Sequence, residues 1–191
     1  MIPFTRWITP TNVPKRFTTQ MYLYFLPLPL ESEKRLLEEI PEREELQVPT
    51  SDGGIEVTEA RFLPATEWLR LAQTGEIILF PPQFLLLHLV AEFLDKAPRP
   101  VDSPAELERR RAALTEFVYS GSPPWTEKCI SPKMMKMRED GRAVLALDHP
   151  GPELKGSERR GESERVIMVR FKKGEAREVD VAWRSSSTSN L

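Results

Sequence analysis

The chain has 191 residues, which suits one ordinary domain or a small core with an appended unit. Hydrophobic residues make up 40% of it and charged residues 29%, a balance typical of globular rather than disordered proteins. The 27 basic residues nearly match the 29 acidic ones, and a net charge of -2 argues against general nucleic-acid binding. The single cysteine, Cys129, excludes an intramolecular disulfide and suits a reducing compartment.

No segment predicts secretion or insertion into a membrane. The first ten residues, MIPFTRWITP, lack a basic region followed by an apolar stretch. The most apolar runs, residues 21–30 and 84–94, are far shorter than the roughly 20 residues that span a bilayer. We therefore expect a soluble intracellular protein with neither a membrane nor a nucleic acid as its partner.

The N-terminal part predicts two strands separated by an acidic segment. Residues 17–26 alternate between an apolar face and a mixed face, as a strand covered on one side does, and Pro27 ends the run. Residues 33–40 predict a short helix among glutamates. Residues 55–63 predict the second strand, which follows a Gly-Gly turn.

Three helices are predicted next. Thr66 is placed to cap the first, which ends at Gly75. Residues 83–95 are apolar almost all round, so this helix should be buried. Ser103 begins the third helix, and Glu106 lies three residues later, where it would complete a capping box.

A β-rich region follows. Residues 142–148, 166–172 and 177–184 predict strands, with a Lys-Gly turn before the last of them. Residues 149–165 are rich in Gly, Glu and Arg and predict a mobile loop.

Four short motifs in the first 95 residues are specific in combination. They are Trp-x-Thr-Pro at 7–10, Arg-Phe-x-Thr at 16–19, Glu-Ala-Arg-aromatic-Leu at 59–63 and Pro-Pro-x-Phe-Leu-Leu-Leu at 81–87. Together they resemble the second half of a Nudix hydrolase domain, in the branch that includes the acyl-coenzyme A diphosphatases.

The resemblance implies an α+β fold in two parts. Residues 1–97 would form part of the Nudix-type mixed sheet with its packing helices, and residues 98–191 would form a helix, a β-hairpin extension and a disordered tail. The activity of the family is cleavage of a diphosphate linkage in coenzyme A or nucleoside-diphosphate derivatives, with Mg²⁺ or Mn²⁺ as cofactor. The expected partner is then a small-molecule diphosphate substrate.

The metal-binding motif of the family is missing from this chain. Its glutamates converge on one helix face because hard cations take oxygen ligands there. Residues 38–45 come nearest, but Glu45 takes the place of the required apolar residue and Pro41 would break the helix. We therefore expect no hydrolysis by this chain alone, and we expect the metal ligands to lie upstream if the chain is part of a longer enzyme.

Several residues are candidates for a functional site. Glu59 is a candidate for an extra carboxylate near the metal, and the alternative is an edge or capping carboxylate paired with an arginine. Arg16 is a candidate for phosphate contact through its forked donors, and the alternative is a surface ion pair. We expect His88 to be a core or edge histidine with its hydrogen bonds satisfied, rather than a ligand. Residues 133–137, Lys-Met-Met-Lys-Met, suggest either a binding face or a gap-filling apolar stretch, and we favour the second.

The last three residues, Ser189, Asn190 and Leu191, are near the Ser-Lys-Leu peroxisomal address. The alternative is an accidental serine-rich end, with the protein in the cytoplasm or mitochondrion.

Two functions remain as hypotheses. The first is a Nudix-type chain that lacks the catalytic motif, in which these residues would orient the substrate of a longer enzyme. The second is a non-catalytic module that recruits a protein partner through an exposed sheet edge or apolar patch.

Overall fold

The structure is a computed structural model. It describes three stretches of the chain, residues 1–27, 61–96 and 103–188. The chain divides into two compact units, residues 1–25 with 64–191, and residues 26–63. Only the first unit is described below. The predicted helix at 33–40 lies outside the described residues, as does most of the predicted strand at 55–63, whose last three residues are not in a strand.

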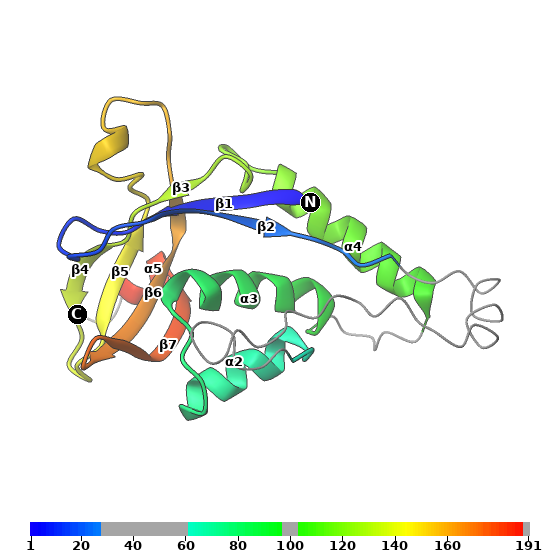
Figure 1. The fold of residues 1–191 in the computed structure, drawn as a ribbon, viewed down its shortest axis with the longest axis horizontal. Helices are drawn as coiled ribbons and strands as arrows, with labels where there is room; N and C mark the ends of the chain where they lie inside the picture. Colours follow the sequence, from blue (N-terminus) through cyan, green and yellow to red (C-terminus); the bar gives the residue numbers. More distant parts are fainter. Residues whose placement is uncertain (28–60, 97–102, 189–191) are drawn as a thin grey trace. The chain divides into compact units, whose positions relative to one another are not determined.

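The first sheet has three strands in the order β2-β1-β3. β1 (Ile2–Ile8) pairs antiparallel with β2 (Thr18–Leu23) and parallel with the short β3 (Cys129–Ile130), as Figure 1 shows. β2 lies within the predicted strand at 17–26 and packs its apolar face against the core, as expected. The sequence did not predict β1, because a bulge between Pro3 and Thr5 interrupts its alternation of buried and exposed residues.

The second sheet has four antiparallel strands in the order β4-β5-β6-β7. They are β4 (Lys133–Met137), β5 (Ala143–Leu147), β6 (Glu162–Lys172) and β7 (Glu175–Trp183). The three predicted strands of this region are confirmed. The predicted loop at 149–165 is shorter than expected, because residues 162–165 belong to β6; the part before β6 contains the 3-10 helix η1 (Pro152–Leu154).

The three predicted helices are confirmed as α2 (Ala65–Thr74), α3 (Pro81–Leu94) and α4 (Pro104–Tyr119). A short α5 (Arg184–Thr188) follows β7. None of the helices within the described ranges is long and apolar enough to cross a bilayer.

The predicted Thr66 cap and the predicted capping box at Glu106 need correction, whereas the Ser103 cap is confirmed. Thr66 lies inside α2, and its backbone N–H and hydroxyl donate to Asp95 Oδ2 over 2.7 and 3.1 Å, which joins the start of α2 to the end of α3. Ser103 does cap α4, since its Oγ accepts the N–H of Glu106 over 3.2 Å. The Glu106 carboxylate turns instead to Arg109 and Arg110 within the helix, so the capping box is not completed.

These elements form an α+β fold, as predicted, around one main apolar core. The core includes residues of β1, α2, α3, α4, β5, β6 and β7. α2 and α3 pack against β7, and α3 also contacts β6. Described residues from both sides of the predicted domain boundary at 97/98 contribute to this core.

A seam of polar contacts joins the two sheets next to this core. Glu162, the first residue of β6, is 0% exposed. Its carboxylate pairs closely with the ammonium group of Lys128 and accepts the N–H groups of Glu164 and Arg165 over 3.0 and 3.1 Å. The backbone oxygen of Lys128 in turn accepts the N–H of Arg6 in β1 over 3.0 Å.

We predict that Glu162→Ala lowers the free energy of unfolding by about 3–5 kcal/mol, because it leaves the charge of Lys128 half-buried without its partner. Urea unfolding followed by circular dichroism measures this. Glu175→Ala is the control, since Glu175 pairs with Arg177 at 2.7 Å on the surface and its loss should cost under about 1 kcal/mol. Equal losses for the two variants would contradict the role of the seam.

Candidate functional site

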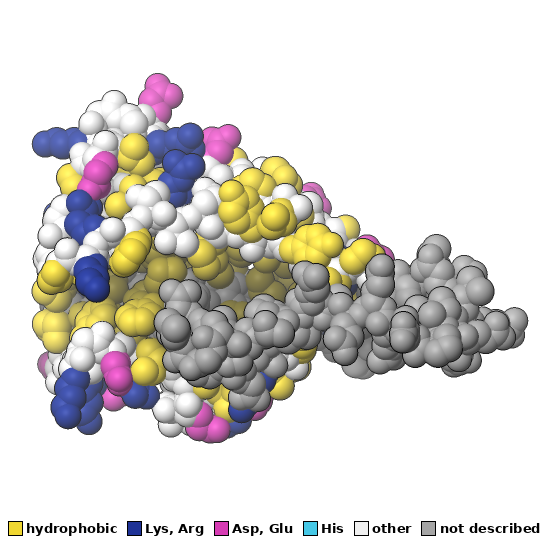
Figure 2. Space-filling model, viewed as in Figure 1, with side chains coloured by type: hydrophobic (Ala, Val, Ile, Leu, Met, Phe, Trp, Pro, Cys, Tyr) yellow, Lys and Arg dark blue, Asp and Glu magenta, His cyan; other side chains and the backbone are white. Residues whose placement is uncertain are grey.

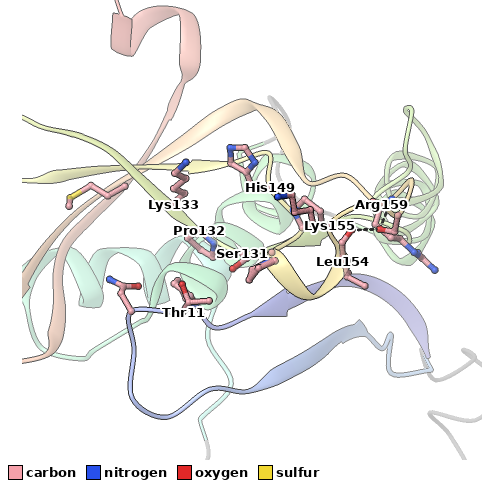
Figure 3. Close-up of a pocket in the computed structure, with 16 residues that line it drawn as sticks. Thr11, Ser131, Pro132, Lys133, His149, Leu154, Lys155 and Arg159 are labelled. Carbon is pink, nitrogen blue, oxygen red and sulfur yellow. Dashed lines mark hydrogen bonds between the residues drawn. The ribbon is translucent and has the colours of Figure 1, made fainter.

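A pocket of about 710 Å³ opens beside the seam. Three segments line it: the turn after β1 (residues 10–12), the residues from the end of β3 into β4 (131–134), and the segment around η1 (149–159). Figure 3 shows Thr11 on one side of the pocket, and Lys133, His149 and Lys155 on the other. The volume lies within the range of about 300–1,000 Å³ that is typical of small-molecule sites.

Backbone contacts hold the three segments together. The N–H of Ser131 donates to the backbone oxygen of His149 over 2.7 Å, and the N–H of Cys129 donates to that of Arg160 over 3.0 Å. Gly151 has φ +96° and comes so close to Ser131 that an added Cβ would lie 3.1 Å from Ser131 Cβ. A larger residue at 151 would therefore be strained and crowded, which explains the glycine of the His-Pro-Gly-Pro turn.

The charges around the pocket are cationic. Lys133 and Lys155 are exposed, and neither forms an ion pair in the part of the chain that the structure describes. No Asp or Glu is among the lining residues, which include the hydroxyl groups of Thr11 and Ser131. Such a pocket favours an anionic ligand, because two ammonium groups and neutral donors line it, while the nearby carboxylates of Glu153 and Asp148 are paired with Arg16 and Arg184.

Arg159 lies at one end of the pocket, and its side chain points outward in Figure 3. Its guanidinium group donates to the backbone oxygen of Glu127 over 3.3 Å, and its N–H donates to Ser157 Oγ over 3.3 Å. Arg159 therefore contributes positive charge at the end of the pocket and fixes the segment, but its guanidinium does not face the two lysines.

His149 lines the pocket beside a partly exposed electrostatic contact. Its Nε2 lies 3.6 Å from Asp148 Oδ1, and Asp148 Oδ2 accepts from Arg184 over 2.9 Å. Burial raises the pKa of Asp148, but the hydrogen bond and the charge of Arg184 outweigh it and hold the pKa below its ordinary value. The ionised Asp148 carboxylate therefore lies beside the His149 ring at the edge of the pocket.

Of the two candidate site residues predicted from the sequence, only Arg16 lies within the described residues. Arg16 pairs with Glu153 of η1, and its Nε donates to the backbone oxygen of Thr9 over 3.1 Å. It thus forms the ion pair that was the alternative to phosphate contact, and this pair joins the β1–β2 turn to the wall of the pocket. Glu59 lies outside the described residues.

The methionine-rich segment at 133–137 differs from our expectation. It is β4, an edge strand, and the exposed fractions of Met134, Met135 and Met137 are 61%, 41% and 58%. The prediction of a gap-filling apolar stretch is therefore wrong. The sequence signal was present, since lysines interleave with the methionines, and that pattern is not typical of a core.

His88 is half-buried on α3, with Nε2 3.8 Å from Glu92 Oε1. Burial, followed by the charge of Lys96, holds the pKa of His88 below its ordinary value. Within the described ranges no three His, Cys, Asp or Glu side chains are grouped so that they could hold a metal ion.

A scan against models of protein families and searches among curated proteins and solved structures found no match to this chain. The resemblance to Nudix hydrolases therefore stays a prediction.

The lowered pKa of His88 predicts how stability depends on pH. The unfolded chain binds a proton near pH 6.5 more readily than the folded one, so stability should fall as the pH drops from 7 towards 5. The measurement is the free energy of unfolding from pH 5 to 8. The slope should be shallower in His88→Asn than in the parent chain. The same slope in the parent chain and in the variant would contradict this prediction.

Proposed function

We propose that the pocket binds the anionic groups of a small molecule that carries phosphates, as part of Nudix-type diphosphate chemistry. The observation that carries this is the pair of exposed lysines, Lys133 and Lys155, which line an open pocket without an ion-pair partner among the described residues. Ammonium groups act as point charges for phosphate oxygens, and the hydroxyls of Thr11 and Ser131 are neutral donors beside them.

The segments that carry the family resemblance support this placement. Pro10, the last residue of the Trp-x-Thr-Pro motif, lines the pocket, while Trp7 of the same motif is buried in the core. Arg16, the first residue of the Arg-Phe-x-Thr motif, pairs with Glu153 on the opposite wall. Two of the four motifs are thus placed to hold this pocket in shape. A peroxisomal site of action, from the terminal Ser189, Asn190 and Leu191, fits the coenzyme A branch.

The chemical role proposed for this chain is binding and orientation. In the family, Mg²⁺ or Mn²⁺ polarises the diphosphate and activates water. The described residues do not offer a fitting set of oxygen ligands for such an ion, so no step through a metal is assigned to them. Lys133 and Lys155 would hold phosphate oxygens, and the rigid turn at Gly151 would fix the wall against which the ligand lies.

Binding of inorganic diphosphate tests this proposal. Isothermal titration calorimetry should detect it at low salt, and Lys133→Ala/Lys155→Ala should weaken it at least tenfold, because hydrogen bonds to charged groups contribute about 1.5–3 kcal/mol each. Lys172→Ala/Lys173→Ala, on the exposed β6–β7 turn, is the control with the same change of charge. Equal weakening in both double variants, or no binding by the parent chain, would contradict the pocket.

A separate assay tests the proposed lack of catalysis. We expect that the purified chain with Mn²⁺ and coenzyme A species releases no phosphate-containing product, because the glutamate-rich motif is missing. Turnover at rates typical of Nudix enzymes, lost in the Lys133→Ala/Lys155→Ala variant, would show that the chain is itself an enzyme. Chromatographic separation of the nucleotides is the measurement.

The second candidate, a protein-interaction module, is favoured by one observation. β4 lies at the edge of its sheet with three exposed methionines.

A further inference from the structure

β4 is the edge of the four-stranded sheet, and no other described strand pairs with its outer side. Unpaired backbone N–H and C=O groups on such an edge can take up another strand. The three methionines of β4 are exposed, whereas all five residues of its neighbour β5 are buried.

The register with β5 sorts the side chains of β4 into two faces. Met134 and Met137 lie opposite Leu145 and Ala143, which face the main core. Lys133 and Lys136 lie opposite Ala146 and Val144, and Val144 belongs to the small cluster on the other side of the sheet. Because paired residues in an antiparallel ladder point to the same face, β4 has a methionine face and a lysine face. The bulge between Met134 and Lys136 produces this sorting.

The methionine face is exposed because the helices do not cover it. α2 and α3 pack on β6 and β7, at the other end of the strand order. In Figure 2, hydrophobic side chains lie among Lys and Arg side chains on the side of the view where β4 lies in Figure 1. Methionine is flexible and polarisable, and it is common on surfaces that adapt to a bound peptide.

We propose that β4 binds an extended segment of a partner protein in which acidic and apolar residues alternate. Added as a fifth strand, such a segment places its apolar side chains beside Met134 and Met137. Its carboxylates then lie beside Lys133 and Lys136 on the other face. This inference goes beyond the small-molecule function proposed above; β4 shares Lys133 and Met134 with the pocket, whereas Lys136 and Met137 lie outside its lining.

A second copy of this chain fits β4 less well than an acidic strand. A symmetric antiparallel pairing of two β4 strands continues each face of one copy into the same face of the other. The lysine faces of the two copies would then lie side by side, and neighbouring like charges destabilise a strand pair.

The experiment uses three synthetic eight-residue peptides. One alternates Glu and Val, one alternates Lys and Val, and one contains only Glu. Fluorescence anisotropy with the whole chain should show binding of the Glu-Val peptide at least tenfold tighter than either of the others, because it alone offers both faces. Equal binding of the all-Glu peptide would overturn the proposal, since that result needs only positive charge.

Hydrogen exchange then locates the bound peptide. The amides of residues 133–137 should exchange more slowly with the Glu-Val peptide present, whereas protection confined to 149–159 would overturn the proposal. Met134→Ser/Met137→Ser should weaken binding on the order of tenfold, since each exposed methionine loses apolar contact with the peptide. Phe171→Ser is the control, because Phe171 is 53% exposed on β6 of the same sheet.

Sedimentation of the chain without peptide completes the test. A monomer is expected. A dimer that dissociates in the Met134→Ser/Met137→Ser variant would overturn the proposal in favour of self-association through β4.

Discussion

The contact between Lys128 and Glu162 holds the two sheets together. Glu162 is 0% exposed, and the charges of Lys128 and Arg165 together with two backbone N–H donors replace the water that its carboxylate loses. Lys128 also lies 4.1 Å above the ring of Trp125, which packs edge-on against Phe4 of β1. One ammonium group thereby connects β6, the first sheet and the aromatic part of the core.

The pocket depends on this seam because its walls begin there. The residue after Lys128 starts β3, which leads directly into Ser131 and Lys133, and the residue before Glu162 is Gly161. An added Cβ on Gly161 would lie 1.9 Å from the backbone oxygen of Leu147, so only glycine allows β6 to begin so close to β5. The segment 149–159 connects the end of β5 to Gly161 and so forms one wall of the pocket.

Regular periodicity made much of the fold predictable, and its interruptions explain what was missed. α3 is apolar all round and α4 begins with Ser-Pro, so both were evident from local chemistry. β1 and β4 each contain a bulge, which disrupts the alternation that marks a strand. The pocket could not be predicted at all, because its three segments meet through long-range contacts such as that of β1 with β3 and that of residue 131 with residue 149.

The same packing decides which surfaces remain for binding. The sheet β4-β5-β6-β7 buries one face on α2 and α3, but these two short helices cover only the end that holds β6 and β7. β5 is buried because its side chains pack into the apolar clusters on both faces and both of its edges are paired, whereas β4 has a neighbour on one side only. Burying methionines at 134 and 137 would need a further element on that face. The lysines on the opposite face disfavour pairing of β4 with a second β4. A strand with alternating acidic and apolar residues contacts the lysine face and the methionine face together.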